Sequence, residues 1–465
     1  MEKYRKESDL IGELEVPEKA YYGVQTQRAL NNFKISHDNM THHPDFIRAF
    51  AWVKKAAAQT NYELEKLPKN LYSAITKACD EILEGKLHEA FPIDMFQGGA
   101  GTSVNMNANE VIANRALEIL GHERGEYKIC SPNDHVNMSQ STNDAYPTAI
   151  HLALIQMNVD LTAHLQQLVD AFRKKSEEFK HVIKMGRTQL QDAVPMTLGQ
   201  EFGAFANGLE EEIANLNYNV KFLETINMGA TAIGTGLNAP KGYAKLCTEN
   251  LEKISGFPLK LAKDLVAATP DTSAFVSYSS ALKRLAVKLS KTCNDLRLLT
   301  SGPRAGLYEI NLPQMQPGSS IMPGKVNPVI PEVVNQICFK VIGNDTTVMM
   351  AAEAGQLQLN VMEPVITQSL MESIHYLQNG MDTLREKCID GITANKDVCE
   401  KMVKNSIGIV TALNPFIGYK NSTKIAKEAL KTGKSVYDLV LEHQLLSKKE
   451  LDDILSPEHM LKPRI

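Results

Sequence analysis

A long stretch without helix breakers constrains the fold of this chain more than any other feature. Between residues 148 and 185 the sequence contains neither glycine nor proline. Apolar residues recur there at steps of three and four, which places them on one face of a helix: Ile150, Leu154, Met157, Leu161, Leu165, Leu168 and Phe172. An unbroken helix over this stretch would measure about 57 Å at ~1.5 Å per residue. One small domain cannot cover such a helix, so we predict a long helical bundle.

Four further segments share this pattern and complete the predicted bundle: residues 195–227, 271–301, 331–362 and 365–384. Glycines at positions 199, 203 and 208 each weaken the helix predicted over residues 195–227 by about 1 kcal/mol, unless a neighbouring helix approaches closely there. We therefore predict a mainly α protein with three domains around a central long five-helix bundle. The predicted domains cover residues 1–143, 144–396 and 397–465.

The flanking segments differ from the bundle in composition. Residues 1–143 mix short helical patterns with glycine- and asparagine-rich loops, and residues 21–24 indicate a short strand or an extended arm. The last domain is predicted to be small and helical, and Ser447 and Glu450 form a capping-box pattern that opens a short helix in it. A single five-helix bundle leaves much of each helix uncovered. We therefore expect a homo-oligomer in which the bundles join into a multi-helix core.

Composition excludes several classes of protein. The 465 residues include 50 basic and 54 acidic side chains, so no basic excess is available to hold nucleic acid or an anionic membrane. The seven cysteines are scattered and odd in number, which favours free thiols in a reducing compartment. The N-terminus lacks the apolar region of a signal peptide, and no stretch reaches the roughly 18 apolar residues of a membrane span. We therefore predict a cytoplasmic protein.

Four loops between the predicted helices carry polar residues that could do chemistry: residues 97–103, 139–144, 186–195 and 318–328. The first two precede helices, where free N–H groups attract anions. Taken alone, the first is better explained as a tight turn with a helix cap, and an elaborate helix cap is the alternative for the second. The third could be a plain connection between helices. The fourth contains two glycines, two serines and a lysine, which suits a mobile lid. A glycine-rich segment at 229–236 could line the same site.

Other motifs do not indicate a site. The first loop lacks the Gly-Lys-Ser/Thr sequence of a phosphate-binding loop, and no strand pattern precedes it as a dinucleotide fingerprint requires. No Gly-x-Ser-x-Gly motif is present. His42, His43 and His135 have no cysteine or carboxylate partners at metal-ligand spacing, so we interpret them as structural and predict no metal ligands.

Taken together, the polar loops resemble the active-site segments of the aspartase/fumarase superfamily. The sequence GSSIMPGKVNP at 318–328 looks like the signature of that superfamily, and GGAGTSVNMNANEV at 98–111 is similar to a second shared segment. The sequence PNDHVNMSQSTNDAYPT at 132–148 is similar to a third, and PEKAYYGVQTQRA at 17–29 looks like the opening motif. The resemblance runs over nearly the whole chain.

Within this superfamily the chain resembles the aspartate ammonia-lyases more than the class II fumarases. Its GAGTSVN and STND sequences look like the ammonia-lyase forms. Gln189 stands where fumarases and some ammonia-lyases carry histidine, whereas other ammonia-lyases carry glutamine. The glutamine removes a histidine that could pair with Glu332, so a His–Glu relay cannot operate here.

The resemblance implies a reaction and a set of roles. L-Aspartate would lose ammonia to give fumarate, with Ser319 as the base that removes the C3 proton, and the carbanion would spread into a carboxylate as an aci-carboxylate. Thr188, Lys325 and Asn327 would hold that carboxylate, while Gln189 and Ser320 would also contact substrate. The other carboxylate and the amino group would lie against four further residues: Thr102, Ser141, Thr142 and Asn143.

The resemblance also implies an assembly and leaves alternatives open. Family members form homotetramers whose active sites are shared between three subunits; they need no organic cofactor, and some respond to magnesium at a site that we do not identify here. The alternative reaction is the hydration of fumarate to L-malate by a class II fumarase. A lyase acting on a larger succinyl compound and a catalytically silent helical scaffold are further hypotheses, and fumarate release from L-aspartate would discriminate among them.

Overall fold

The computed structural model describes residues 3–460, apart from the side chains of residues 457 and 458. The chain divides into two compact units. The first unit contains the chain up to Thr162, together with Ala214–Arg284 and Phe339–Leu377. The second unit contains Ala163–Ile213, Leu285–Cys338 and the chain from Gln378 onward.

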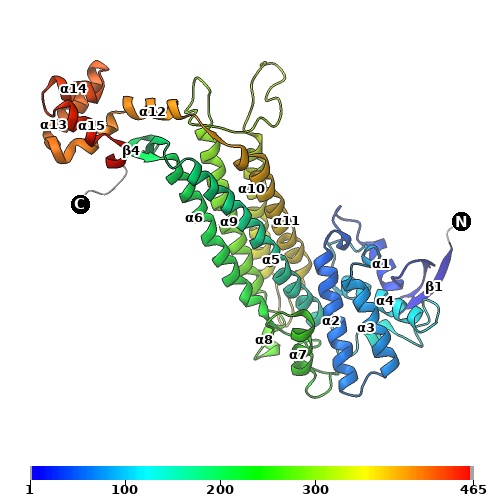
Figure 1. Cartoon of the computed structure of the whole chain (residues 1–465). Coiled ribbons are helices and arrows are strands. Elements are labelled where there is room, and N and C mark those ends of the chain that lie inside the picture. The colour runs from blue at the N-terminus through cyan, green and yellow to red at the C-terminus, as the bar shows by residue number, and fades with distance from the viewer. Residues whose placement is uncertain (1–2, 461–465) are drawn as a thin grey trace. The chain divides into compact units, whose positions relative to one another are not determined.

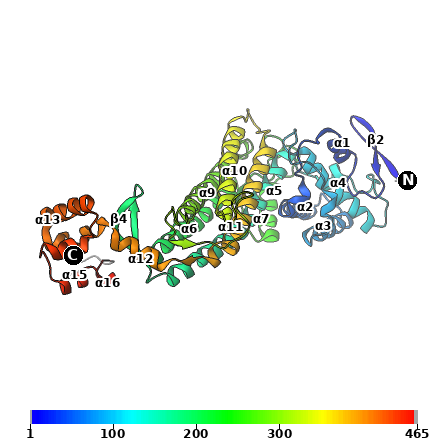
Figure 2. The same cartoon turned by 90° about the horizontal axis from the view of Figure 1, so that it is seen from above.

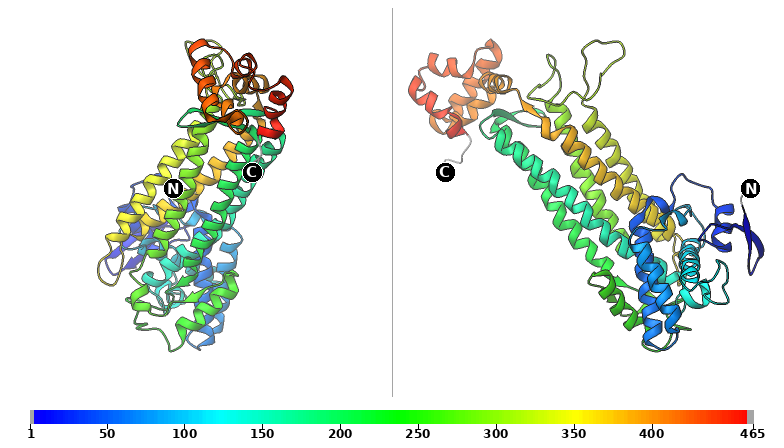
Figure 3. Two further views of the ribbon diagram at one scale, coloured as in Figure 1. Left: turned by 90° about the vertical axis from the view of Figure 1, so that its left-hand side faces the viewer. Right: turned by 45° about the vertical axis from the view of Figure 1, so that its right-hand side comes forward.

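Five long helices dominate the structure, as the sequence predicts (Figures 1 and 3). They are α5 (Thr142–Glu178), α6 (Leu198–Asn219), α9 (Ser273–Leu299), α10 (Val329–Glu353) and α11 (Glu363–Lys387). All seven apolar residues that define the predicted face of α5 are buried, with at most 2% exposure. The apolar residues that recur at helical spacing in the next two segments are buried as well: Leu282, Leu285, Leu289, Leu296 and Leu299 in α9, and Ile366, Leu370, Ile374 and Leu377 in α11. The prediction of a mainly α fold is therefore confirmed.

The helix predicted to continue to residue 185 ends earlier, and that part of the prediction is wrong. α5 ends at Glu178, and β3 (Ile183–Thr188) pairs with β4 (Gln191–Thr197) in an antiparallel hairpin. The third polar loop is therefore a hairpin and not a plain helix connection. The pairing of the two strands is a tertiary interaction that the helical pattern does not show. Gly199 at the start of α6 lies so close to α5 that a Cβ would be 2.4 Å from the Ser176 carbonyl oxygen. That glycine serves close helix approach, one of the two interpretations that the sequence allows.

The N-terminal segment opens with β1 (Tyr4–Asp9) and β2 (Gly12–Pro17), an antiparallel hairpin that the sequence analysis did not predict. Helices α1 (Val24–Asn32), α2 (Pro44–Glu63), α3 (Lys69–Leu83) and α4 (Thr102–Ile119) follow. The predicted strand at residues 21–24 is wrong, because residues 21–23 are irregular and α1 begins at Val24. The buried Glu110 carboxylate accepts the N–H groups of Gly23, Gln25 and Thr26, which provides the helix cap that the local sequence lacks.

Short elements complete the first unit: η1 (Met40–His42), η2 (His88–Ala90), η3 (Pro132–Val136), η4 (Val220–Glu224), β5 (Thr225–Ile226), α7 (Tyr243–Ser255), β6 (Lys260–Leu261) and α8 (Leu265–Ala268). The second unit adds β7 (Ile310–Asn311), η5 (Ile389–Gly391), β8 (Thr393–Ala394), α12 (Lys396–Asn405), η6 (Ile407–Ile409), α13 (Val410–Thr432), α14 (Val436–Glu442), α15 (Lys448–Ile454) and α16 (Pro457–Met460) (Figure 2). The capping box predicted at Ser447 and Glu450 is present at the start of α15. The predicted boundaries of three domains stay a prediction.

The seven cysteines are free and buried, as the sequence analysis expects. Among the described residues, no helix is both long enough and apolar enough to cross a membrane.

Several large apolar side chains on the long helices are exposed, among them Val287, Phe339, Met349 and Met350.

Candidate active site

The predicted site residues fall into two groups that belong to different compact units. Thr102, Ser141, Thr142 and Asn143 lie in the first unit. The remaining six lie in the second unit: Thr188, Gln189, Ser319, Ser320, Lys325 and Asn327.

The glycine-rich loop before α4 holds Thr102 at the first position of that helix. Gly101 caps the helix with a φ of 89°, and a Cβ at this position would lie 2.3 Å from the Tyr146 ring. A residue with a side chain therefore cannot replace it without displacing the ring. The exposed Thr102 donates its hydroxyl proton to the Gly99 carbonyl at 2.7 Å. In this arrangement the Thr102 oxygen is free to accept a hydrogen bond from a ligand.

The start of α5 is a polar cap built around Asp144. The Ser141 N–H donates to Asp144 Oδ1 at 2.9 Å, while the other carboxylate oxygen accepts the N–H groups of Gly229 and Thr231. Asp144 is fully buried, and this burial raises its pKa to about 6. These contacts pack the 229–236 segment against the start of α5, where the sequence analysis allowed it to line a site.

Asn143 joins the same segment through its side chain and its main chain. Its Nδ2 donates to the Ala232 carbonyl at 2.7 Å. Its own carbonyl would normally accept the N–H of residue 147, but Pro147 has none. The Asn227 side chain replaces that donor at 3.0 Å. The proline can therefore lie inside the helix without leaving this acceptor unsatisfied.

Thr142 rests on a buried amide network that the sequence analysis did not predict. Its Oγ1 accepts a hydrogen bond from Asn105 Nδ2 at 3.2 Å. Behind Asn105, Lys54 of α2 is completely buried, and its Nζ donates to three side-chain amide oxygens, those of Asn105, Asn137 and Gln140. Burial lowers the pKa of Lys54 to about 7. A lysine within the alanine-rich, apolar pattern of α2 is the one sequence signal that could have indicated this site.

Thr188 and Gln189 lie at the exposed tip of the β3–β4 hairpin. The two central residues of this turn, Gln189 and Leu190, have φ values of 55° and 62°. Two-residue hairpin turns of this type usually carry asparagine and glycine, because those residues tolerate a positive φ. Backbone strain of this kind concentrates at functional sites, which makes the tip a candidate part of the site.

A cluster of ion pairs between Lys184, Arg187, Glu201 and Glu309 lies at the base of that hairpin. Lys184 of β3 contacts Glu309 Oε2 at 2.8 Å and Glu201 of α6 at 2.5 Å. Arg187 contacts the other Glu309 oxygen at 2.8 Å. Glu309 is completely buried, so two cations surround one carboxylate away from water. Such groups are retained in the interior only when they are paired, and the pairing fixes the direction of the hairpin.

The signature loop at 318–328 closes on itself at its base. The Gly318 N–H donates to the Lys325 carbonyl at 2.7 Å, and Asn327 Nδ2 donates to the Gly318 carbonyl at 2.8 Å. A Cβ on Gly318 would lie 2.6 Å from the Lys325 oxygen, so only glycine permits this closure. Asn327 therefore holds the loop with one N–H, and its second N–H is available to a ligand.

Ser319 lies inside this closed loop and accepts two backbone hydrogen bonds. The N–H groups of Ile321 and Met322 donate to its Oγ at 3.2 and 3.0 Å. Ser320 and Lys325 are exposed. The apolar side chains of Ile321 and Met322 are also exposed, to 83% and 47%. The expectation that this loop acts as a lid stays a prediction.

The histidines noted in the sequence make structural contacts. His43 is buried with its Nε2 at 2.9 Å from Asp38 Oδ1, and His135 Nδ1 accepts the Ser131 N–H at 2.8 Å. Among the described residues, no three His, Cys, Asp or Glu side chains are grouped so that they could hold a metal ion.

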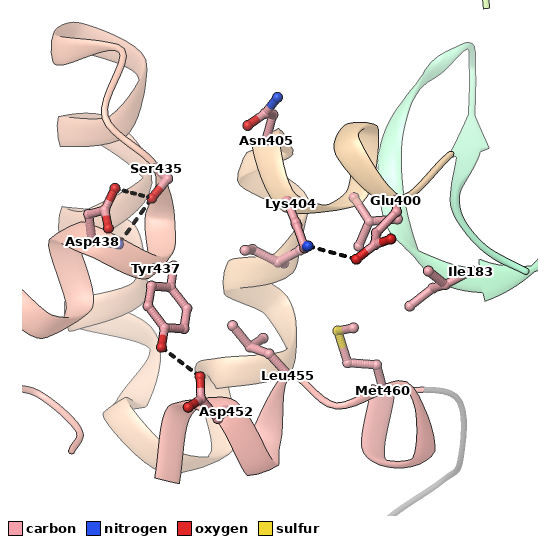
Figure 4. Close-up of a pocket in the computed structure, with 12 residues that line it drawn as sticks. Ile183, Glu400, Lys404, Asn405, Ser435, Tyr437, Asp438, Asp452, Leu455 and Met460 are labelled. Carbon is pink, nitrogen blue, oxygen red and sulfur yellow. Dashed lines mark hydrogen bonds and ion pairs between the residues drawn. The ribbon is translucent and has the colours of Figure 1, made fainter. Parts of the chain in front are cut away.

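A cavity of about 570 Å³ in the C-terminal part of the second unit contains none of the predicted site residues (Figure 4). Its rim carries the carboxylates of Glu400, Asp438 and Asp452 and a single lysine, Lys404, which is paired with Glu400 at 2.6 Å. Because carboxylates outnumber cations there, the cavity would repel a dicarboxylate. The two polar groups described above are the better candidates for the active site.

Comparison with protein families gives two matches along the chain. A family described as "Lyase" matches residues 12–343, and one described as "Fumarase C C-terminus" matches residues 409–462. The first match covers both groups of predicted site residues. The second falls on the helices of the C-terminal segment.

Curated relatives are similar over almost their full length. The chain is 59% identical to an aspartate ammonia-lyase of Escherichia coli (strain K12), over 99% of this chain and 96% of that protein. It is 60% identical to an aspartate ammonia-lyase of Pseudomonas aeruginosa, over 99% of this chain and 98% of that protein. The chain is 57% identical to an aspartate ammonia-lyase of Helicobacter pylori, over 99% of this chain and 98% of that protein.

Solved structures share the fold. A Brucella melitensis structure described as a fumarate lyase:delta crystallin bound to cobalt is 54% identical, with a TM-score of 0.96 over 99% of this chain and 100% of that chain. A class II fumarase from Schistosoma mansoni is 35% identical, with a TM-score of 0.92 over the full length of both chains.

Proposed function

This chain belongs to the aspartase/fumarase superfamily, and we propose that it is a carbon–nitrogen lyase that eliminates ammonia from L-aspartate to give fumarate. Three relatives that share 57–60% of its residues over nearly their whole length are aspartate ammonia-lyases. The class II fumarase with the same fold is more distant, at 35% identity. The polar loops supply groups for each part of this reaction.

The hydrogen bonds to Ser319 carry the proposal for the base. A serine hydroxyl is a weak acid, and hydrogen bonds donated to the deprotonated oxygen lower its pKa. The N–H groups of Ile321 and Met322 are aimed at that oxygen. Ser319, as an alkoxide, takes the C3 proton of L-aspartate, and the electron pair of that C–H bond moves into the adjacent carboxylate.

The resulting aci-carboxylate carries two negative charges and needs cations and donors. We assign Lys325, Asn327 and Thr188 to this carboxylate, and Gln189 and Ser320 to neighbouring contacts with substrate. Asn327 retains one N–H beyond the one that closes the loop. The bond from C2 to nitrogen then breaks, its electron pair leaves with ammonia, and the C2–C3 double bond of fumarate forms. Interactions that strengthen as charge develops account for the rate.

The groups in the first unit suit the other end of the substrate. The Thr102 hydroxyl donates its hydrogen bond to the Gly99 carbonyl, so its oxygen accepts a hydrogen bond from the substrate ammonium group. Ser141, Thr142 and Asn143 lie at the start of α5, where the helix dipole favours a carboxylate.

The resemblance of the polar loops to the active-site segments of the superfamily favours a site completed by other copies of the chain. We propose a homotetramer with active sites shared between three subunits. Exposed apolar side chains on α9 and α10, including Val287 and Phe339, are suited to burial between such bundles. The molar mass by light scattering, set against 51.5 kDa for one chain, tests this assembly.

We further propose that the reaction requires no organic cofactor, because the aci-carboxylate delocalises the electrons by itself. Magnesium would act only as an activator, at a site that we do not assign. The buried free thiols favour a reducing, cytoplasmic location.

The test is the ultraviolet absorbance of fumarate after L-aspartate is added to the purified protein, with L-malate in a parallel cuvette. A rise with L-aspartate that Ser319→Ala abolishes is the expected result. A rise with L-malate alone would identify a class II fumarase instead. Silence with both would contradict the small-dicarboxylate proposal.

A further inference from the structure

The side chain of Lys54 is completely buried. A buried ammonium group is costly unless each of its protons is donated to a hydrogen-bond acceptor. Its three protons match three acceptors: Asn105 Oδ1 at 2.7 Å, Gln140 Oε1 at 2.9 Å and Asn137 Oδ1 at 3.1 Å. In its ammonium form, which a pKa of about 7 keeps populated at and below neutral pH, lysine has no acceptor atom, so each amide turns its oxygen toward it. Lys54 therefore fixes which end of each amide faces inward.

The orientation of Asn105 follows from this contact. With its oxygen on Lys54, its amide nitrogen must point the other way, where it donates to Thr142 Oγ1 at 3.2 Å and to Asn137 Oδ1 at 3.2 Å. Both N–H groups of Asn105 are thus used. A reversed Asn105 would place two N–H groups against an ammonium, so the low-dielectric interior disfavours that state strongly.

The direction of the Thr142 proton follows in turn. Because its oxygen accepts from Asn105, its own proton has to be donated elsewhere. Among the residues that the structure describes, no hydrogen bond donated by the Thr142 hydroxyl is present. Thr142 is 9% exposed, so its hydroxyl lies at the edge of the solvent-accessible surface, where the substrate carboxylate is proposed to bind.

We infer that Lys54 is a positioning residue that acts through Asn105 to hold the Thr142 hydroxyl as a hydrogen-bond donor toward the substrate carboxylate. This inference rests on the proposed function, because the proposed function is what places the carboxylate at Thr142. Lys54 itself has no exposed surface and does not touch the substrate.

Asn105→Asp tests the inference with the least disturbance of the fold. The new carboxylate still accepts from Lys54, but it offers an oxygen to Thr142 in place of an N–H. The Thr142 proton then turns inward and is lost to the substrate. A lost hydrogen bond to a charged group raises the KM for L-aspartate by about tenfold or more, with kcat changed less than about threefold, because the ground state and the transition state lose the same contact.

A double-mutant cycle separates this effect from the added negative charge and from any structural damage. Thr142→Val removes the hydroxyl and keeps the shape, so Asn105→Asp should cost at least about fivefold less in KM in that background. In Thr142→Ser, which retains the hydroxyl, the full effect should persist. Equal effects in all three backgrounds would overturn the inference.

Two further variants complete the design. Lys54→Met leaves the amide oxygens of Asn105 and Gln140 without their donor and can unfold the chain, so it is interpreted only if circular dichroism and the thermal midpoint match those of the wild type. When folded, it should also raise KM, and an unchanged KM would contradict the inference. Lys55→Met on the same helix is the matched control, because Lys55 pairs with Asp80 at 2.5 Å outside the network and its kinetics should stay unchanged.

The activity of the wild type with L-aspartate distinguishes a failure of the proposed function from a failure of the proposed role of Lys54. If the wild type releases no fumarate from L-aspartate, the proposed function fails. If the wild type is active and the cycle is additive, the proposed function stands and the role of Lys54 is wrong.

Discussion

The ring of Tyr146 lies so close to Gly101 that a methyl group at residue 101 would be 2.3 Å from Cδ2 of the ring. The contact locks the start of α4 against α5 and sets the position of Thr102, the next residue. It ties a glycine in the first polar loop to an aromatic residue 45 positions later in the sequence.

Gly101→Ala should therefore destabilise the protein by more than about 2 kcal/mol, because it combines a positive φ with displacement of a buried ring. It should also raise the KM for L-aspartate by moving Thr102. Gly98→Ala is the matched control, since nothing lies within 4 Å of a Cβ there. Thermal unfolding and steady-state kinetics check both variants, and equal thermal midpoints for the two would contradict this account.

Removal of the Glu309 charge should be among the most damaging single changes in the second unit. Glu309→Gln removes the only carboxylate that Arg187 contacts among the described residues and leaves Lys184 paired with Glu201 alone, which costs about 3 kcal/mol. Glu442→Gln, which breaks the exposed pair with Lys434, should leave the thermal midpoint unchanged. The comparison fails if both variants unfold at the same temperature as the wild type.

Acid sensitivity should depend in part on His151. Burial lowers its pKa to about 4, whereas an unfolded histidine titrates near 6.5. Between those values the unfolded chain binds the extra proton, so stability falls as the pH drops from 6.5 to 4, by at most about 1.4 kcal/mol per pH unit. His151→Asn keeps a donor for the Leu223 carbonyl, which His151 Nδ1 contacts at 2.8 Å, and removes the titration. The variant should lose less thermal stability than the wild type between pH 7 and pH 5, and parallel losses would refute the assignment.

The thiols should be unreactive in the folded protein. Burial raises the pKa of Cys79, Cys247 and Cys399 to about 12, and the remaining four are buried as well. Since the thiolate is the reactive form, an Ellman titration at pH 8 should label few thiols before denaturation and all seven in guanidinium. Rapid labelling of the native protein would contradict the buried positions.

Shared active sites predict complementation between a variant that lacks the base and a variant that binds substrate weakly. Ser319→Ala and Thr142→Val change different polar loops, so at L-aspartate concentrations far below KM each homo-oligomer has low activity for a different reason. If separate chains supply Ser319 and Thr142, random mixing of the two variants gives about a quarter of the sites both native residues. Mixed and reassembled samples should regain up to about that fraction of wild-type activity. No recovery in mixtures that light scattering shows to have exchanged subunits would place both residues of a site on one chain.

Local sequence determined much of this protein. The spacing of apolar residues in α5, α9 and α11 fixed both the helices and their buried faces, because a helical period needs no distant information. The capping box at Ser447 was likewise readable, since its two members lie three residues apart. The polar loops could be recognised as candidates by their composition and their resemblance to a family.

The tertiary structure decided what depends on distant partners. α1 begins at Val24 because Glu110, far along the chain, accepts its first N–H groups, and no local pattern shows this. The β3–β4 hairpin depends on the pairing of two strands and on Glu309 beneath it. The role of Lys54 depends on amides that α4 and the segment before α5 bring to it. Burial turns an ordinary lysine into a group that fixes the orientation of its neighbours, because in a low dielectric every proton must find an acceptor.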